Sequence, residues 1–139
     1  MSTVLIVDDD PDIRLLLRLE LSAEGHQIME AGDGQEALAA LEADDVDLML
    51  LDIMMPVLDG WGVLKALETT PTPPIVIITA LATDDDRHIA ELLEAGALDV
   101  IAKPFDPGWL VRLATAVLLV EPDERAEYRQ RRLERARRA

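Results

Sequence analysis

The stretch V-L-I-V-D-D-D-P, from Val4 to Pro11, contains most of the first predicted strand and the residues that follow it. The four aliphatic residues are typical of a strand that is buried on both faces of a parallel sheet. Three aspartates follow at once, although like charges about 4 Å apart repel by about 4 kcal/mol at an effective dielectric of about 20. A buried strand that ends in repelling acids predicts a polar site at the carboxyl edge of an open sheet, where ligands of such sheets bind.

Similar aliphatic runs recur along the chain and alternate with helical patterns. Apolar residues are spaced as one helical stripe after the first run, and a fifth helix is expected over about Pro107 to Val120. A β-α unit repeated five times predicts an α/β fold, with a parallel sheet and helices on both faces. The predicted strands are Thr3–Val7, Gln27–Ala31, Val46–Leu51, Ile75–Thr79 and Asp99–Ala102.

The length of 139 residues suits one hydrophobic core, which we assign to residues 1–120. Residues 121–139 form a separate basic, helical tail with seven arginines and five acidic residues. Pro122 suits a helix start, and Glu127–Arg131 and Glu134–Arg138 are favourable i,i+4 pairs. The tail is interpreted as a linker helix to an output domain, as a contact arm for an acidic partner, or as a solvated helix.

The formal net charge of −15 lies mainly in the body of the chain. An acidic surface lacks the Lys and Arg side chains that bind phosphate backbones, so no direct contact with nucleic acid is expected. The chain has no cysteine, no signal-peptide pattern and no apolar run long enough for a membrane span. A cytoplasmic domain without a membrane contact is therefore expected.

Polar residues follow the predicted strands at the edge where their carboxyl ends meet. Asp8 and Asp9 follow the first strand, Asp52 the third, and Lys103 the fifth, while Thr79 ends the fourth. Oxygen ligands without His or Cys favour Mg²⁺, or Mn²⁺, over zinc. Together with an ammonium and a hydroxyl group, such a cation suits phosphoryl transfer to a carboxylate. Asp10 precedes a proline and is interpreted as a helix N-cap instead.

Five blocks of sequence follow one another between about Thr3 and about Val120: V-D-D-D-P, A-G-D-G-Q-E-A-L, L-L-D-I-M-M-P-V-L-D-G, I-I-T-A and A-G-A-L-D-V-I-A-K-P-F. Together they resemble the response-regulator receiver domain of two-component signalling. The resemblance implies a flavodoxin-like sheet with strand order 2-1-3-4-5. It also implies that Asp52 accepts a phosphoryl group from the phosphohistidine of a histidine kinase or from a phosphotransfer protein.

The resemblance also assigns the metal ligands. Asp9, Asp52 and the backbone carbonyl of Met54 would bind Mg²⁺ directly, and Asp8 would bind it through water. Such a domain is not a conventional enzyme, since it catalyses only its own phosphorylation and dephosphorylation.

Further residues of the site follow from the same resemblance. Lys103 and the hydroxyl of Thr79 would contact the phosphoryl oxygens, Pro104 would follow a cis peptide bond, and Ala80 would have a structural role. Val100 stands where receivers often carry Tyr or Phe three residues before the lysine. Because this ring takes no part in the chemistry, we expect phosphorylation to survive its absence, while the signal must travel by another repacking.

The expected output surface combines the fourth helix, the fifth strand and the fifth helix. A downstream partner, an output domain or a second copy in a homodimer would bind there. Two alternatives stay open: an adaptor that uses the fold without phosphorylation, and a metal-dependent phosphatase with an aspartyl nucleophile. Met54 counts against the phosphatase, because such enzymes usually have a second acid two residues after the nucleophile.

Overall fold

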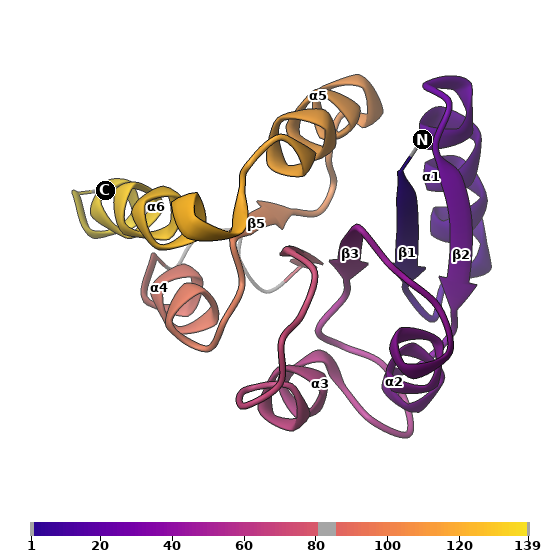
Figure 1. Ribbon diagram of the computed structural model, residues 1–139, viewed down its shortest axis with the longest axis horizontal. Coiled ribbons are helices and arrows are strands. Elements are labelled where there is room, and N and C mark those ends of the chain that lie inside the picture. Colours follow the sequence, from indigo (N-terminus) through magenta and orange to yellow (C-terminus); the bar gives the residue numbers. More distant parts are fainter. Residues whose placement is uncertain (1, 81–85, 139) are drawn as a thin grey trace.

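The computed structural model describes residues 2–80 and 86–138 (Figure 1). Its five strands form one parallel sheet in the order β2-β1-β3-β4-β5, which confirms the predicted fold class and strand order. The strand β3 begins at Leu48, two residues later than predicted from Val46. Asp47, just before it, accepts a hydrogen bond from the backbone N–H of Thr3 through its carboxylate at 2.8 Å. The strands are β1 (Thr3–Val7), β2 (Gln27–Ala31), β3 (Leu48–Leu51), β4 (Ile75–Thr79) and β5 (Asp99–Ala102).

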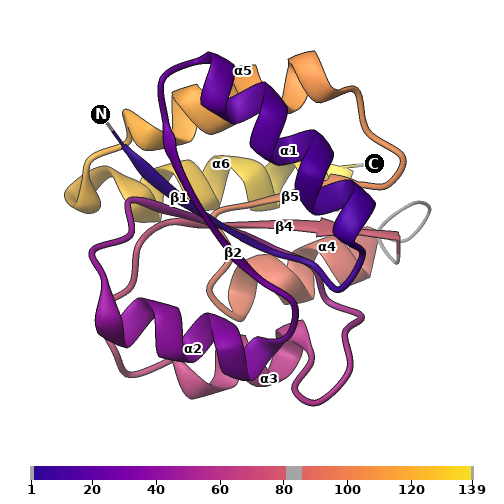
Figure 2. The same ribbon diagram turned by 90° about the vertical axis from the view of Figure 1, so that its right-hand side faces the viewer.

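Helices cover both faces of the sheet. Figure 2 shows α1 and α5 on one face and α2, α3 and α4 on the other. The sequence favoured Asp84, Asp85 and Asp86 as the start of the fourth helix; Asp84 and Asp85 lie outside the described residues. The helices are α1 (Pro11–Ala23), α2 (Gly34–Ala43), α3 (Gly60–Ala66), α4 (Asp86–Glu94), α5 (Pro107–Leu118) and α6 (Arg125–Arg138), with a short 3-10 helix η2 (Pro122–Glu124) before α6.

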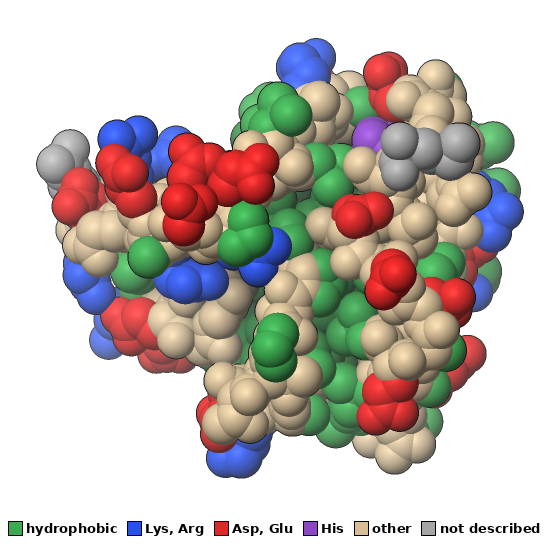
Figure 3. All heavy atoms as spheres, viewed as in Figure 1, with side chains coloured by type: hydrophobic (Ala, Val, Ile, Leu, Met, Phe, Trp, Pro, Cys, Tyr) green, Lys and Arg blue, Asp and Glu red, His purple; other side chains and the backbone are tan. Residues whose placement is uncertain are grey.

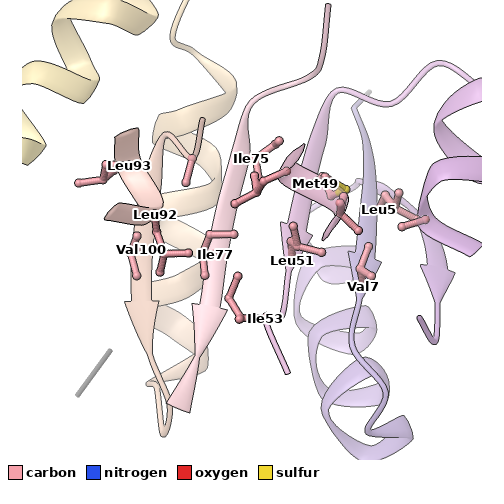
Figure 4. Packing of buried hydrophobic residues seen from close by; sticks show 14 of the residues in the cluster. Leu5, Val7, Met49, Leu51, Ile53, Ile75, Ile77, Leu92, Leu93 and Val100 are labelled. Carbon is pink, nitrogen blue, oxygen red and sulfur yellow. The ribbon is translucent and has the colours of Figure 1, made fainter. Parts of the chain in front are cut away.

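Successive residues of each central strand enter opposite halves of the core, since side chains alternate across a strand. Val4 and Ile6 of β1 pack with residues of α1 and α5. Leu5 and Val7 pack in the other half, with side chains from β3, β4 and α4 (Figure 4). The two-sided burial explains why β1, β3 and β4 are almost wholly aliphatic.

Aspartates cap several of the helices that follow the strands. The Asp10 side chain accepts a hydrogen bond from the backbone N–H of Asp12 at 2.9 Å, which confirms its predicted N-cap role. Asp33, Asp59 and Asp106 cap α2, α3 and α5 in the same way. These caps fix where the chain turns from the carboxyl edge of the sheet into each helix.

The tail forms the expected helix and lies against the body of the protein. In Figure 1, α6 runs beside α4 at the β5 edge of the sheet. Basic and acidic side chains alternate over its outer surface (Figure 3). The predicted pair of Glu127 and Arg131 is formed at 2.6 Å and is exposed, whereas the side chain of Arg138, which the sequence paired with Glu134, lies outside the described residues.

Candidate functional site

Three carboxylates meet at the carboxyl edge of the sheet. Asp8 and Asp9 follow β1, and Asp52 follows the neighbouring strand β3. One oxygen atom from each of the three residues lies within 4.8 Å of the others. Asp8 and Asp52 are buried, at 3% and 5% exposed, while Asp9 is exposed. The three acids therefore lie together at this edge, as the sequence predicted. The exposed Asp9 leaves one side of the cluster open to solvent.

Lys103 is the cation that contacts this cluster. Its Nζ atom lies 2.9 Å from Asp8 Oδ2 and 3.2 Å from Asp52 Oδ2. The lysine reaches both acids because it directly follows β5, where the backbone N–H of Lys103 donates to the carbonyl of Thr79 at 3.0 Å. The ammonium group thus contacts two of the three clustered carboxylates, and the acids outnumber it.

The pKa values of Asp52 and Lys103 reflect this imbalance. Burial raises the pKa of Asp52, and the nearby charge of Asp8 raises it further, although Lys103 partly opposes both effects. Burial alone would lower the pKa of Lys103, but its hydrogen bond to Asp8 and the charges of Asp8 and Asp52 outweigh burial and raise it. A divalent cation beside Asp52 would relieve the repulsion that remains.

The remaining predicted residues lie around this edge. Thr79 ends β4 between β3 and β5 and is fully buried, and Ala80 follows it. The Lys103–Pro104 peptide bond is cis. The Met54 side chain is 60% exposed and lies in the loop after β3. The roles given to the Thr79 hydroxyl and the Met54 carbonyl stay predictions.

Gly60, the first residue of α3, supports the loop that carries Asp52. Its backbone N–H donates to the carbonyl of Ile53 at 2.8 Å. A Cβ atom at Gly60 would lie 2.6 Å from the carbonyl oxygen of Asp52 and 2.7 Å from Cα of Ile53. Helix α3 therefore begins directly against the loop that carries Asp52, an approach that only glycine allows.

A third buried acid, Asp99, was not predicted as a functional residue from the sequence. It opens β5, is 5% exposed, and accepts hydrogen bonds from Tyr128 Oη at 2.6 Å and from Arg132 Nε at 2.8 Å. Both partners come from α6, about thirty residues further along the chain. An acid at the start of a β-strand was the available signal, but a single sequence does not reveal such a distant partner.

Residues 4–115 match the response regulator receiver domain family. The match covers well over half of the chain, and this protein belongs to that family. Its fold and the acidic pocket at the carboxyl edge are those expected of a receiver domain of a two-component response regulator.

Curated relatives include full-length regulators. The chain is 41% identical over 115 residues to "Probable transcriptional regulator ycf27" of Porphyridium aerugineum, with 83% of this chain and 47% of the relative covered. It is 42% identical over 118 residues to "Transcriptional regulatory protein CpxR" of Escherichia coli K12, with 85% and 50% covered. The chain thus spans about half the length of the curated relatives it matches.

Solved structures agree with this family. The receiver domain of the Francisella response regulator 1452 superposes with a TM-score of 0.79 at 30% identity, over 85% of this chain and 97% of that one. The chemotaxis response regulator CheY4 of Vibrio cholerae gives 0.77 at 31% identity, over 84% and 98%. The response regulator TrrA of Thermotoga maritima, in complex with Mg²⁺ and a beryllium fluoride, gives 0.74 at 31%, over 84% and 99%.

The names of the curated relatives bear on the expected absence of nucleic-acid contacts. They describe transcriptional regulators. The expectation of no contact with nucleic acid therefore applies to these residues and not to a longer protein that contains them.

Within residues 2–80 and 86–138, no helix has the length and apolar character needed to cross a bilayer.

Proposed function

We propose that this receiver domain is a phosphorylation switch with Asp52 as the phosphoryl acceptor. An oxygen of Asp52 forms a bond to phosphorus while the bond from phosphorus to the donor breaks, so the donor leaves without the phosphoryl group. A phosphohistidine of a histidine kinase or of a phosphotransfer protein is the proposed donor. The observation that carries this proposal is the contact of one ammonium, that of Lys103, with both Asp8 and Asp52.

The acidic pocket fits a Mg²⁺ ion, with Mn²⁺ as the alternative. Asp8, Asp9 and Asp52 offer hard oxygen donors within 4.8 Å of one another, and the carbonyl of Met54 is a further proposed ligand. When bound, the cation would neutralise phosphoryl oxygens and the repulsion among the acids. Lys103 then holds a second phosphoryl oxygen, and the Thr79 hydroxyl a third.

The phosphorylated domain would signal through the surface formed by α4, β5 and α5. A downstream protein, an output domain or a second copy of the chain is the proposed partner. Val100 lies in this region and is 5% exposed within the core. Because this side chain is aliphatic, the proposed route of the signal is a repacking of α4 and β5.

Intact-mass spectrometry after incubation with acetyl phosphate and Mg²⁺ tests the assignment. We expect one phosphoryl group on the unmutated chain and none on Asp52→Asn. Asp10→Asn is a matched control, because Asp10 is an adjacent exposed acid that caps α1; it should take up one phosphoryl group as the unmutated chain does. Equal adduct on Asp52→Asn would show that the acceptor lies elsewhere.

A further inference from the structure

Helix α6 covers part of the surface through which the domain is proposed to signal. Leu133 is 7% exposed and belongs to the same buried cluster as Leu92 and Leu93 of α4 and Val100 of β5. Ala136, one turn further on, is 3% exposed. The apolar side of α6 therefore completes the core over α4 and β5 at the edge of the sheet (Figure 1).

Polar contacts fix the orientation of α6 on this surface. Tyr128 and Arg132 both bond to the buried carboxylate of Asp99. Arg129 donates to the carbonyls of Ala97 at 3.0 Å and Gly96 at 3.2 Å, just after α4 ends. A shift of α6 along its axis would break these hydrogen bonds to carbonyl and carboxylate oxygens.

The same contacts link α6 to the phosphorylation site through one short strand. β5 begins at Asp99, which α6 holds, and is followed directly by Lys103, which holds Asp8 and Asp52. Arg132 Nη2 also lies 3.4 Å from the carbonyl oxygen of Val100. Helix α6 thus contacts the residue that stands where receivers often carry an aromatic ring.

The docking of α6 carries energetic costs. Arg125 Nε is buried and has no hydrogen-bond partner among the described residues. Burial and the nearby Arg125 lower the pKa of Arg129. Apart from Leu133 and Ala136, the described side chains of α6 are partly or fully exposed. A helix with such a narrow buried stripe should detach far more easily than the sheet unfolds.

We propose that α6 is a detachable cover of the α4–β5 surface, and that phosphorylation of Asp52 weakens its docking. This inference rests on the proposed phosphorylation of Asp52. In the structure, α6 is docked while Lys103 pairs with Asp8 and Asp52. A phosphoryl group would draw Lys103 away from that pairing, and β5 transmits the change to Asp99 and Val100. A partner of the surface then gains access only after α6 leaves.

Hydrogen exchange in the full chain tests the first half of the inference. With acetyl phosphate and Mg²⁺, the backbone amides of residues 128–136 should exchange about tenfold faster than without them, since a lost charged hydrogen bond corresponds to at least that factor. Amides of β1 and β3 report on the body and should stay protected. Unchanged exchange of α6 in a chain that carries the phosphoryl group would overturn the inference.

The reverse effect follows from linkage, because two coupled equilibria act on each other equally. Arg132→Gln should loosen α6, and the concentration of beryllium fluoride, a reversibly binding mimic of the phosphoryl group, needed for half-maximal binding with Mg²⁺ should fall several-fold. Arg131→Gln is the matched control, since Arg131 pairs with Glu127 within α6 and is exposed. Leu133→Ala tests the same point without touching a charge. Identical behaviour of both variants and the control would contradict the coupling.

The design separates this inference from the proposed function. If the unmutated chain takes up no phosphoryl group, or if the Asp52→Asn variant still takes one up, the assignment of Asp52 is overturned and the inference with it. Normal phosphorylation at Asp52 with α6 equally protected in all states would overturn the cover alone. Circular dichroism melting of each variant identifies a substitution that unfolds the body, and hydrogen exchange of the unmutated chain decides the matter in that case.

Discussion

Strand β5 has a buried ionic cluster at each end, and the two clusters are balanced differently. At its start, Asp99 bonds to Arg132, to Tyr128 and to the backbone N–H of Val100 at 2.8 Å. At its far end, Lys103 faces Asp8 and Asp52, with Asp9 beside them. The first acid has a full set of donors, whereas the second cluster keeps excess negative charge.

The difference separates a structural ionic group from a reactive one. A buried acid with matched donors stabilises the contact between two elements, and removing it leaves a half-buried arginine without its partner. Buried acids that repel one another cost stability unless a cation or a proton joins them. The same chemical group is therefore expected to respond in opposite ways at the two ends of β5.

The largest effect is expected at the balanced end. Asp99→Asn removes the charge that Arg132 and Tyr128 bond to, and it should lower the free energy of unfolding by up to about 3 kcal/mol, with the free energy of α6 docking as the upper limit. Urea denaturation of the full chain measures this change. Arg131→Gln, on the exposed side of α6, serves as the control and should change it by less than about 0.5 kcal/mol. A loss as small in Asp99→Asn would mean that α6 is not held by this acid.

Tyr128→Phe is expected to have the next largest effect. It removes a hydroxyl that donates to Asp99 at 2.6 Å, and it should cost about 1.5 kcal/mol. Burial, with the hydrogen bond and charge of Asp99, raises the pKa of Tyr128 above its ordinary value of 10.0. Folding therefore favours the protonated phenol, so the advantage of the unmutated chain is full below pH 10.0 and declines as the pH rises above it. A constant difference between the two chains up to pH 11 would contradict this assignment.

Magnesium should act only at the unbalanced end. At ten times its dissociation constant, a cation that binds the folded chain alone stabilises it by about 1.4 kcal/mol. Thermal melts with and without MgCl₂ should show this gain for the unmutated chain and for Asp99→Asn alike. Asp8→Asn should lose most of it. An equal gain in Asp8→Asn would place the cation outside the acidic pocket.

The smallest effect has the opposite sign from the first. Without Mg²⁺, Asp52→Asn should raise the free energy of unfolding by about 1 kcal/mol at neutral pH, since it removes a buried charge that Asp8 repels. The raised pKa of Asp52 means that the folded chain holds this proton more tightly. The gain should therefore shrink as the pH falls toward the ordinary value of 3.8. Denaturation at several pH values checks both the sign and the trend.

Much of the fold and of the site could be predicted from local patterns. The all-aliphatic strands and the helical stripes between them determine a parallel α/β sheet, because the spacing of apolar residues follows the period of each element. Parallel strands bring their carboxyl ends to one edge. Asp8, Asp52 and Lys103 therefore had to lie near one another, although Lys103 is 95 residues from Asp8.

Other features depend on which elements meet in space. The sequence by itself determined that residues 121–139 favour a charged helix, since Pro122 and the i,i+4 pairs are local signals. Only the tertiary structure decided that this helix docks on α4 and β5, and that Arg132 bonds to Asp99 rather than to solvent. The physical reason is that a buried ion pair depends on two groups 33 residues apart and on the burial around them, and neither residue carries a local mark of its partner.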